Sequence, residues 1–333
     1  MRLWGVAILW VMLFHSKIVI SESIFYIPIK ILKSSGYIGV DIFILLSGMG
    51  VYHSINDGFC FKKYISRRLL KIIPAFWFSL TIFYILKSYD GFQYEASEII
   101  YSFLGLDLFI NDSIVYWFIP SIFICYLIAP ILVKVLDSCY SDRYKLTSLL
   151  ILYILGLIIV YNFLSVILIF YIRVPVFFLG LYVGKCIVRT SVTPQNLVRN
   201  STIITIVGML VVALILGMFD WQYRKETGIS WYISAVLAFP ITIVICEFFE
   251  RNKVNTRLLN VFFRKLGVLS LELYLFHIII FEFLVNVEFW RGDWNFLRIP
   301  EYILYVIFSF LLSVLFVRFL KTFQVINILN RSR

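Results

Sequence analysis

The chain has 333 residues, of which 62% are hydrophobic, 19% aromatic and only 15% charged. Soluble globular domains carry roughly 25% charged residues, so this composition excludes an ordinary soluble protein and indicates an integral membrane protein. The formal net charge of +11 does not indicate nucleic-acid binding, because the basic residues form short clusters between apolar runs, as they do in cytoplasmic loops of membrane proteins.

Apolar runs long enough to cross a bilayer recur along the whole chain, and they predict an all-α, polytopic transmembrane helix bundle of about ten spans. We expect no cleaved signal peptide, because no basic region precedes the first run. No polar linker separates the runs, so residues 1–333 are predicted to form a single integral-membrane domain. The runs cover residues 3–20, 37–52, 69–86, 115–136, 146–161, 163–184, 201–219, 230–248, 266–286 and 301–320.

The Lys and Arg counts of the loops predict the orientation of these spans. Alternate loops are basic, whereas the loops between them, including residues 87–114, are acidic or mixed. We therefore expect a multi-pass protein of the cell inner (plasma) membrane with both termini in the cytoplasm. The basic loops begin with the cluster Lys62, Lys63, Arg67, Arg68 and Lys71.

His15 is the only titratable residue between Arg2 and Lys17 in the first run. An ionisable side chain inside a span is costly and by default marks a functional site. Counting residues along the helix places His15 about 18 Å from its inner end, and Asp41 about 6 Å inside the outer end of the next helix. At such similar depths, the Asp41 carboxylate would fix the imidazole tautomer and leave the other nitrogen as a base. Alternatively, Asp41 caps its helix or faces an outer vestibule alone.

Three further polar residues lie inside the later spans. Arg173 and His277 come to mid-membrane depth, His277 at about 16 Å from the inner edge. A buried Arg needs an anionic partner, for which Glu272 is the candidate within the protein and an anionic ligand is the alternative.

The segment FKKYISRRLLKIIP at 61–74 is basic with interleaved aromatic residues at the inner interface. Either it anchors the chain on anionic lipid, or Arg67, Arg68 and Lys71 cradle a polyanionic ligand such as the phosphates of coenzyme A. His53 is expected to be an ordinary solvated residue. The five cysteines show no metal-ligand spacing, and we expect no metal site.

Six blocks carry a family resemblance when they are taken together and in order: LFHS (13–16), GYIGVDIFILLSG (36–48), RRLLKIIPAFW (67–77), WFIPSIFICYLIAP (117–130), RVPVFFLG (173–180) and LGVLSLELYLFH (266–277). The chain resembles the acyltransferase-3 family, the integral-membrane acyltransferases that O-acetylate bacterial surface polysaccharides and related glycans. The resemblance covers nearly the whole chain.

This resemblance implies transfer of an acyl group, most simply acetyl, from acyl-CoA to a hydroxyl of a surface or lipid-linked glycan. Acetyl-CoA or another acyl-CoA would be a co-substrate, with no bound cofactor, and the partners would be the donor, the glycan and membrane lipid. His15 matches the essential first-helix histidine of the family and would be the general base. Arg173 or a backbone amide would stabilise the oxyanion. Trp117, Glu272, Tyr274 and His277 lie in or beside these blocks and are expected to support the site.

One position departs from the family pattern. The family commonly has an Arg on the histidine's helix face, with ten residues between the two, where this chain has Trp4. Either Arg2 reaches around the helix, another basic residue substitutes, or the assigned start of the chain is wrong.

Two readings compete with acyl transfer. A multispan bundle lined with polar groups would also suit a transporter or exporter of a small anionic or acylated molecule, although no internal repeat is visible. The second is a family-like protein that binds donor or glycan without catalysis.

Overall fold

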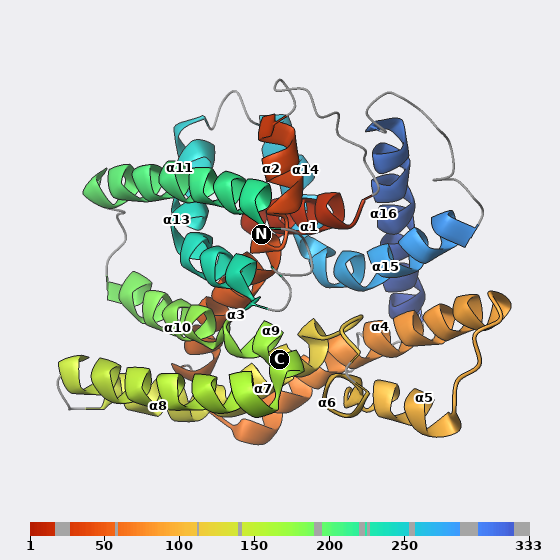
Figure 1. The fold of residues 1–333 in the computed structure, drawn as a ribbon, viewed down its shortest axis with the longest axis horizontal. Helices are drawn as coiled ribbons and strands as arrows, with labels where there is room; N and C mark the ends of the chain where they lie inside the picture. Colours follow the sequence, from red (N-terminus) through yellow and green to blue (C-terminus); the bar gives the residue numbers. More distant parts are fainter. Residues whose placement is uncertain are drawn as a thin grey trace. The chain divides into compact units, whose positions relative to one another are not determined.

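The computed structural model describes residues 1–16, 27–56, 59–111, 113–138, 142–189, 195–219, 224, 227–252, 257–286 and 299–322 (Figure 1). The described residues form helices and no strands, which confirms the all-α prediction. The helices are α1 (Arg2–His15), α2 (Ile27–Ser34), α3 (Ile38–Asn56), α4 (Phe61–Tyr89), α5 (Ala96–Phe103), α6 (Asp107–Ile110), α7 (Phe118–Asp137), α8 (Asp142–Phe163), the 3-10 helix η2 (Ser165–Ile167), α9 (Leu168–Tyr171), α10 (Val174–Arg189), α11 (Gln195–Met218), α13 (Ile229–Arg251), α14 (Arg257–Val268), α15 (Ser270–Asn286) and α16 (Ile299–Thr322).

Most of these helices are apolar enough for a bilayer. Among the described residues, seven helices are long and apolar enough to cross a membrane, or eight if the bent pair of α14 and α15 counts as one span. Two shorter apolar helices, α1 and residues 147–163 of α8, occupy the remaining predicted runs. The polytopic bundle is thereby confirmed, while ten crossings and cytoplasmic termini stay predictions. Residues 17–20 of the first run lie outside the described residues.

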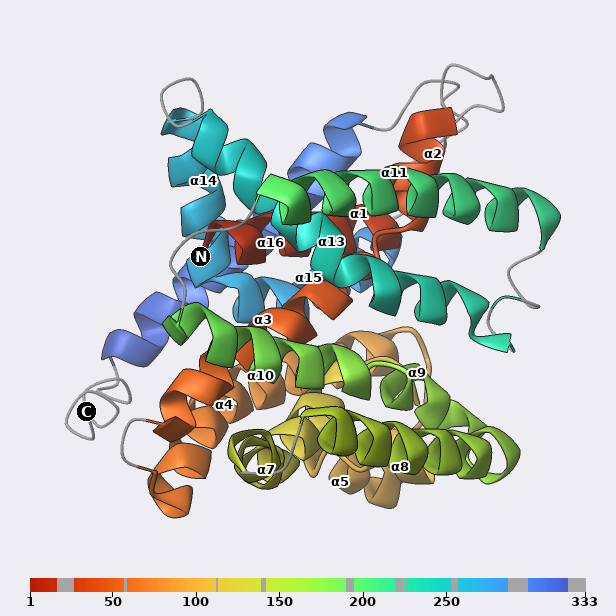
Figure 2. The same ribbon diagram turned by 90° about the vertical axis from the view of Figure 1, so that its left-hand side faces the viewer.

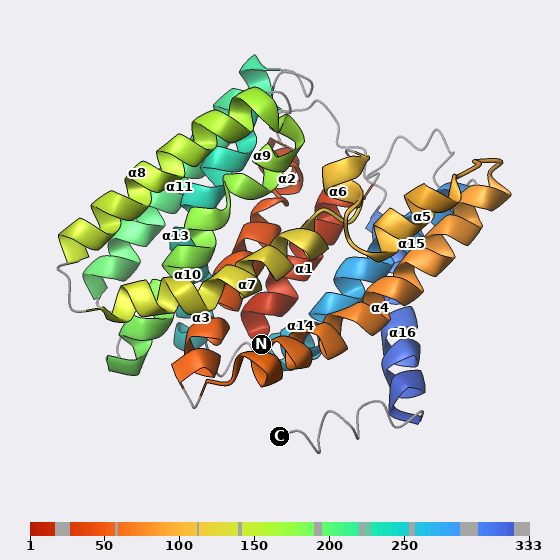
Figure 3. The same cartoon turned by 90° about the horizontal axis from the view of Figure 1, so that it is seen from below.

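The chain divides into two compact units. That residues 1–333 form a single domain stays a prediction. The first unit contains Met1–Val40, Ser66–Glu95 and Phe248–Arg333. Within it α1 packs along α14 and against α15, and α16 packs against α15 (Figure 1, Figure 3). Glycine permits the close approach of α1 to α14, because a Cβ at Gly5 would clash with the carbonyl oxygen of Phe263.

The second unit contains Asp41–Ile65 and Ala96–Glu247. Here α7 lies beside α8 (Figure 2) and also packs against α10. Helices α3 and α10 approach backbone to backbone, since a Cβ at Gly48 would clash with the carbonyl of Phe177 and one at Gly180 with that of Leu45. Gly184, one turn after Gly180, also lies close to α3, since a Cβ there would clash with the carbonyl oxygen of Met49. Small residues at this spacing are typical of close helix contacts.

Two predicted spans are interrupted. The run 266–286 is predicted as one helix, but α14 ends at Val268 and α15 begins at Ser270, with a bend of 77° between them. The run 163–184 has a shorter interruption, because α9 ends at Tyr171 and α10 begins at Val174, although Leu168–Ile187 still counts as one candidate span. Arg173 therefore lies at a junction between two helices, and Pro175 fits the first turn of α10, where its missing N–H has no intrahelical partner to lose.

Candidate functional site

An imidazole pair lies in the first unit, where α1 packs against α15. His15 is the last residue of α1 and its side chain is exposed. His277 on α15 is only 1% exposed. Their ring centroids are 5.1 Å apart with an interplanar angle of 59°, so the two rings are in packing distance. The exposed imidazole that the sequence singles out therefore has a second, buried imidazole as its neighbour.

The hydrogen bonding of His277 defines its tautomer. Its Nδ1 lies 3.2 Å from the carbonyl oxygen of Leu273, one turn earlier on α15. A carbonyl only accepts hydrogen bonds, so Nδ1 carries the proton and Nε2 of the neutral ring is an acceptor. Nε2 is buried and has no hydrogen-bond partner among the described residues. The ring of Tyr274 packs beside the imidazole of His277, with ring centroids 5.6 Å apart.

Glu272 is the acidic residue in the first turn of the same helix. Its Oε2 is buried without a hydrogen-bond partner in the described part of the chain. Lys71 of α4 is close enough to interact electrostatically with this carboxylate. Arg67, one turn before Lys71, is exposed, and Arg68 is half-buried. Lys71 of the basic block of α4 and Glu272 in the first turn of α15 are therefore neighbours within the first unit.

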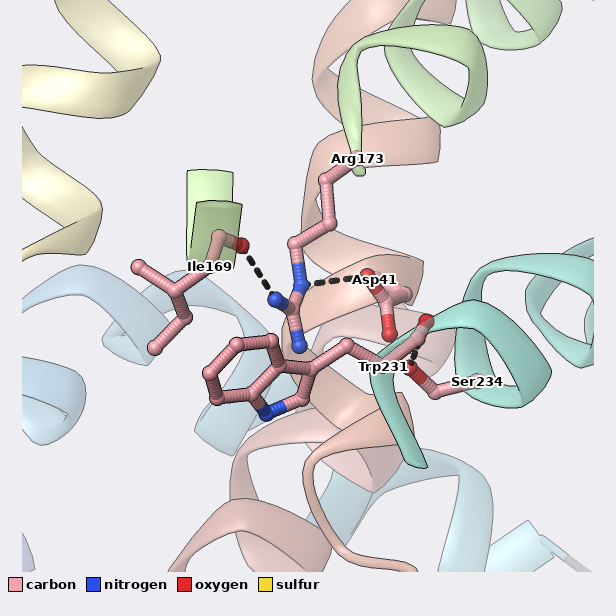
Figure 4. Close-up of polar contacts among 5 residues, drawn as sticks. All are labelled: Asp41, Ile169, Arg173, Trp231 and Ser234. Atoms are coloured by element: carbon pink, nitrogen blue, oxygen red, sulfur yellow. Dashed lines mark hydrogen bonds and ion pairs between the residues drawn. The ribbon is translucent and has the colours of Figure 1, made fainter. Parts of the chain in front are cut away.

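Arg173 and Asp41 form an ion pair in the second unit (Figure 4). The Nε of Arg173 donates to Oδ1 of Asp41 over 2.7 Å, and the two side chains are 1% and 0% exposed. Nη1 donates to the carbonyl oxygen of Ile169. The sequence suggests Glu272 as the anionic partner of Arg173 within the protein. This is wrong, because the partner in the structure is Asp41. The pairing of Asp41 with His15 joins residues of different units and stays a prediction.

Two indole rings complete the surroundings of the guanidinium. Its central carbon lies 4.9 Å from the ring centroid of Trp117 and 5.9 Å from that of Trp231. Ser234 interacts with the Asp41 carboxylate but donates its hydrogen bond to the carbonyl of Trp231, so Oδ2 of Asp41 has no donor among the described residues. Figure 4 shows Trp231 and Ser234 on α13, beneath the ion pair.

Sequence reasoning missed Trp231, Ser234 and the contact between the two histidines. Trp231 stands at the start of a span, as interfacial tryptophans do, and this signal would have found it. The contact between the histidines had a signal in their predicted depths, about 18 Å and about 16 Å.

Arg2 does not reach around α1. Its guanidinium pairs with Glu250 at 2.9 Å, donates to Asn260 at 3.0 Å and lies 5.2 Å from the ring centroid of Phe249. The suggestion that Arg2 replaces the family's arginine beside His15 is therefore wrong. His53, near the end of α3, is exposed, as expected for a solvated residue.

No group of three or more His, Cys, Asp or Glu side chains that would hold a metal ion occurs in the part of the chain that the structure describes.

The comparisons with known proteins agree with the sequence blocks. A family model described as an acyltransferase domain, that of acyltransferase-3, matches residues 3–318, nearly the whole chain. No curated protein and no solved structure matches. The matched region contains both the imidazole pair and the Asp41–Arg173 ion pair. The chain therefore belongs to the acyltransferase-3 family and is a membrane acyltransferase.

Proposed function

We propose that the protein is an O-acyltransferase of the inner (plasma) membrane. It moves an acyl group, most simply acetyl, from acyl-CoA to a hydroxyl of a surface or lipid-linked glycan. The family match supports acyl transfer, and the exposed imidazole of His15 at the end of α1 carries the assignment of the base. A glycan is the acceptor class because the six blocks resemble enzymes that modify surface polysaccharides.

His15 serves as the general base in this reaction. One of its ring nitrogens takes the proton of the acceptor hydroxyl while the oxygen bonds to the thioester carbonyl carbon. The carbon–sulfur bond then breaks, and the coenzyme A thiolate leaves with the proton returned from His15. The products are the ester and the free thiol, and the enzyme regains its starting protonation state.

The donor is held by cations of α4. Arg67, Arg68 and Lys71 lie on one helical segment, and the first of these is exposed. Guanidinium groups bind phosphate through paired, charge-assisted hydrogen bonds, which suits the phosphates of coenzyme A. Arg173 is the weaker candidate for donor binding, because it is buried and its charge is balanced by Asp41.

The function is tested by following the label from radioactive acetyl-CoA in nanodiscs that contain the purified protein. We expect ester-linked label on added glycan extract, and one free thiol released for each acetyl group transferred. Empty nanodiscs are the control. Two results together would contradict acyl transfer and favour the competing hypothesis of a transporter. They are the absence of thiol release both with and without glycan, and the uptake of acetyl-CoA or an acetylated product into proteoliposomes.

A further inference from the structure

His277 is buried beside the exposed base, and its two ring nitrogens have different surroundings. Nδ1 is committed to the carbonyl of Leu273, whereas Nε2 is a buried acceptor with no hydrogen-bond partner among the described residues. A buried polar atom without a partner is unfavourable and rare, so its retention calls for a donor that reaches it.

His15 is the neighbour that can supply such a donor. Its ring centroid lies 5.1 Å from that of His277, and its side chain is exposed. A neutral imidazole has one N–H, and its other nitrogen accepts. If the N–H of His15 points to Nε2 of His277, the remaining nitrogen of His15 is unprotonated and available to the acceptor hydroxyl.

We propose that His277 is the positioning residue of the base: its Nε2 accepts a hydrogen bond from the N–H of His15 and fixes the tautomer and orientation of that ring. The role of His15 as the base rests on the proposed function, whereas the hydrogen bond between His15 and His277 does not. It extends the general arrangement of a base oriented by a third group, with a neutral imidazole in the place usually taken by a carboxylate.

The position of the proton follows from this arrangement. His277 keeps its own proton on Nδ1, because the Leu273 carbonyl holds it there. His15 alone gains the proton of the acceptor hydroxyl and passes it to the leaving thiolate. His277 therefore touches no reacting atom and adds no net charge to the apolar surroundings.

Substitutions at His277 separate positioning from packing. In His277→Gln the amide oxygen extends to the place of Nε2 and accepts the same hydrogen bond. In His277→Asn the shorter amide reaches only the place of Nδ1 and keeps the bond to Leu273. We expect His277→Gln to retain kcat within a few-fold, and His277→Asn and His277→Phe to lose kcat by on the order of 10-fold or more with KM for acetyl-CoA unchanged. Equal kcat values for His277→Gln and His277→Asn would overturn the proposal.

Nitrogen NMR of histidine-labelled protein tests the contact without an activity assay. His53→Ala leaves two of the three histidines, His15 and His277. We expect Nε2 of His277 to be unprotonated and hydrogen-bonded, and His15 to show a single tautomer that becomes a mixture in His277→Phe. A protonated Nε2, or a His15 spectrum unchanged by His277→Phe, would overturn the proposal. If the wild type cleaves no acetyl-CoA, the proposed function fails, and these spectra still decide the contact.

Discussion

Arg173 donates from Nε to Oδ1 of Asp41 over 2.7 Å, and both side chains are almost completely removed from solvent. This pair joins the residue before α10 to the first turn of α3, within the second unit. Each charge is compensated only while the other is present. The ion pair therefore makes the most direct prediction about stability.

Removal of one charge should destabilise the protein strongly. In Asp41→Asn the buried guanidinium loses its counter-charge, and breaking a buried pair in this way costs about 3–5 kcal/mol. We expect a lower midpoint of thermal unfolding in detergent, measured by the loss of soluble monomer after heating.

The double variant Asp41→Asn with Arg173→Met provides the control for this prediction. It removes both charges, so its loss of stability should be smaller than the sum of the two single losses. Additive losses would mean that the two charges are not coupled and that another anion compensates Arg173.

Two glycines of α3 test the close packing of α3 against α10. A Cβ at Gly48 would clash with the carbonyl of Phe177, whereas a Cβ at Gly50 has no atom within 4 Å. Overpacking costs about 1–3 kcal/mol, so Gly48→Ala should lower the free energy of unfolding by that amount. Gly50→Ala should leave it unchanged or raise it by up to about 1 kcal/mol, since Ala favours helix. Denaturant unfolding in detergent measures both, and equal effects would refute the helix contact.

Arg2 should be dispensable for catalysis. It pairs with Glu250 and Asn260, and it precedes His15 by almost the whole length of α1. Arg2→Ala should keep acetyl-CoA cleavage within a few-fold and lose at most about 1 kcal/mol of stability, because the ion pair is partly exposed. A fall in kcat comparable to that of a His15 variant would show that Arg2 serves the base after all.

Arg67 should contribute to donor binding without affecting the chemical step. A hydrogen bond between charged groups contributes about 1.5–3 kcal/mol, so Arg67→Ala should raise KM for acetyl-CoA by about 10-fold or more and leave kcat unchanged. The effect should shrink with a donor that lacks the 3′-phosphate. Lys321→Ala, a cation in the last turn of α16, is the matched control. Equal KM values for the two variants would argue for lipid anchoring by the basic block.

Hydropathy and loop charge predict the helical class well, because a bilayer requires long apolar helices whatever their packing. Every predicted apolar run overlaps at least one helix among the described residues. The pattern misses the 77° bend between α14 and α15, since hydropathy along a segment carries no information about its direction.

The partners of polar residues are predicted less well. Counting residues gives the depth of Arg173 but not which helices lie beside it. The sequence therefore leaves Glu272 as the candidate within the protein, although Glu272 is counted at a lower depth, whereas the structure has Asp41. The same limit hid the contact between His15 and His277, although their depths are similar. His15 stands out in the sequence because an ionisable residue in a long apolar run is rare, and its catalytic role stays a prediction.

The cleavage of acetyl-CoA by purified protein in nanodiscs, with acceptor glycan present, tests the central claim most directly. The comparison is between wild type, His15→Ala and His53→Ala at matched folded yield, where His53 is the exposed histidine of α3. A general base contributes roughly 100-fold or more, so His15→Ala should lose at least that factor while His53→Ala matches the wild type. Undiminished cleavage by His15→Ala would contradict the assignment of the base, and three equally inert proteins would contradict acyl transfer itself.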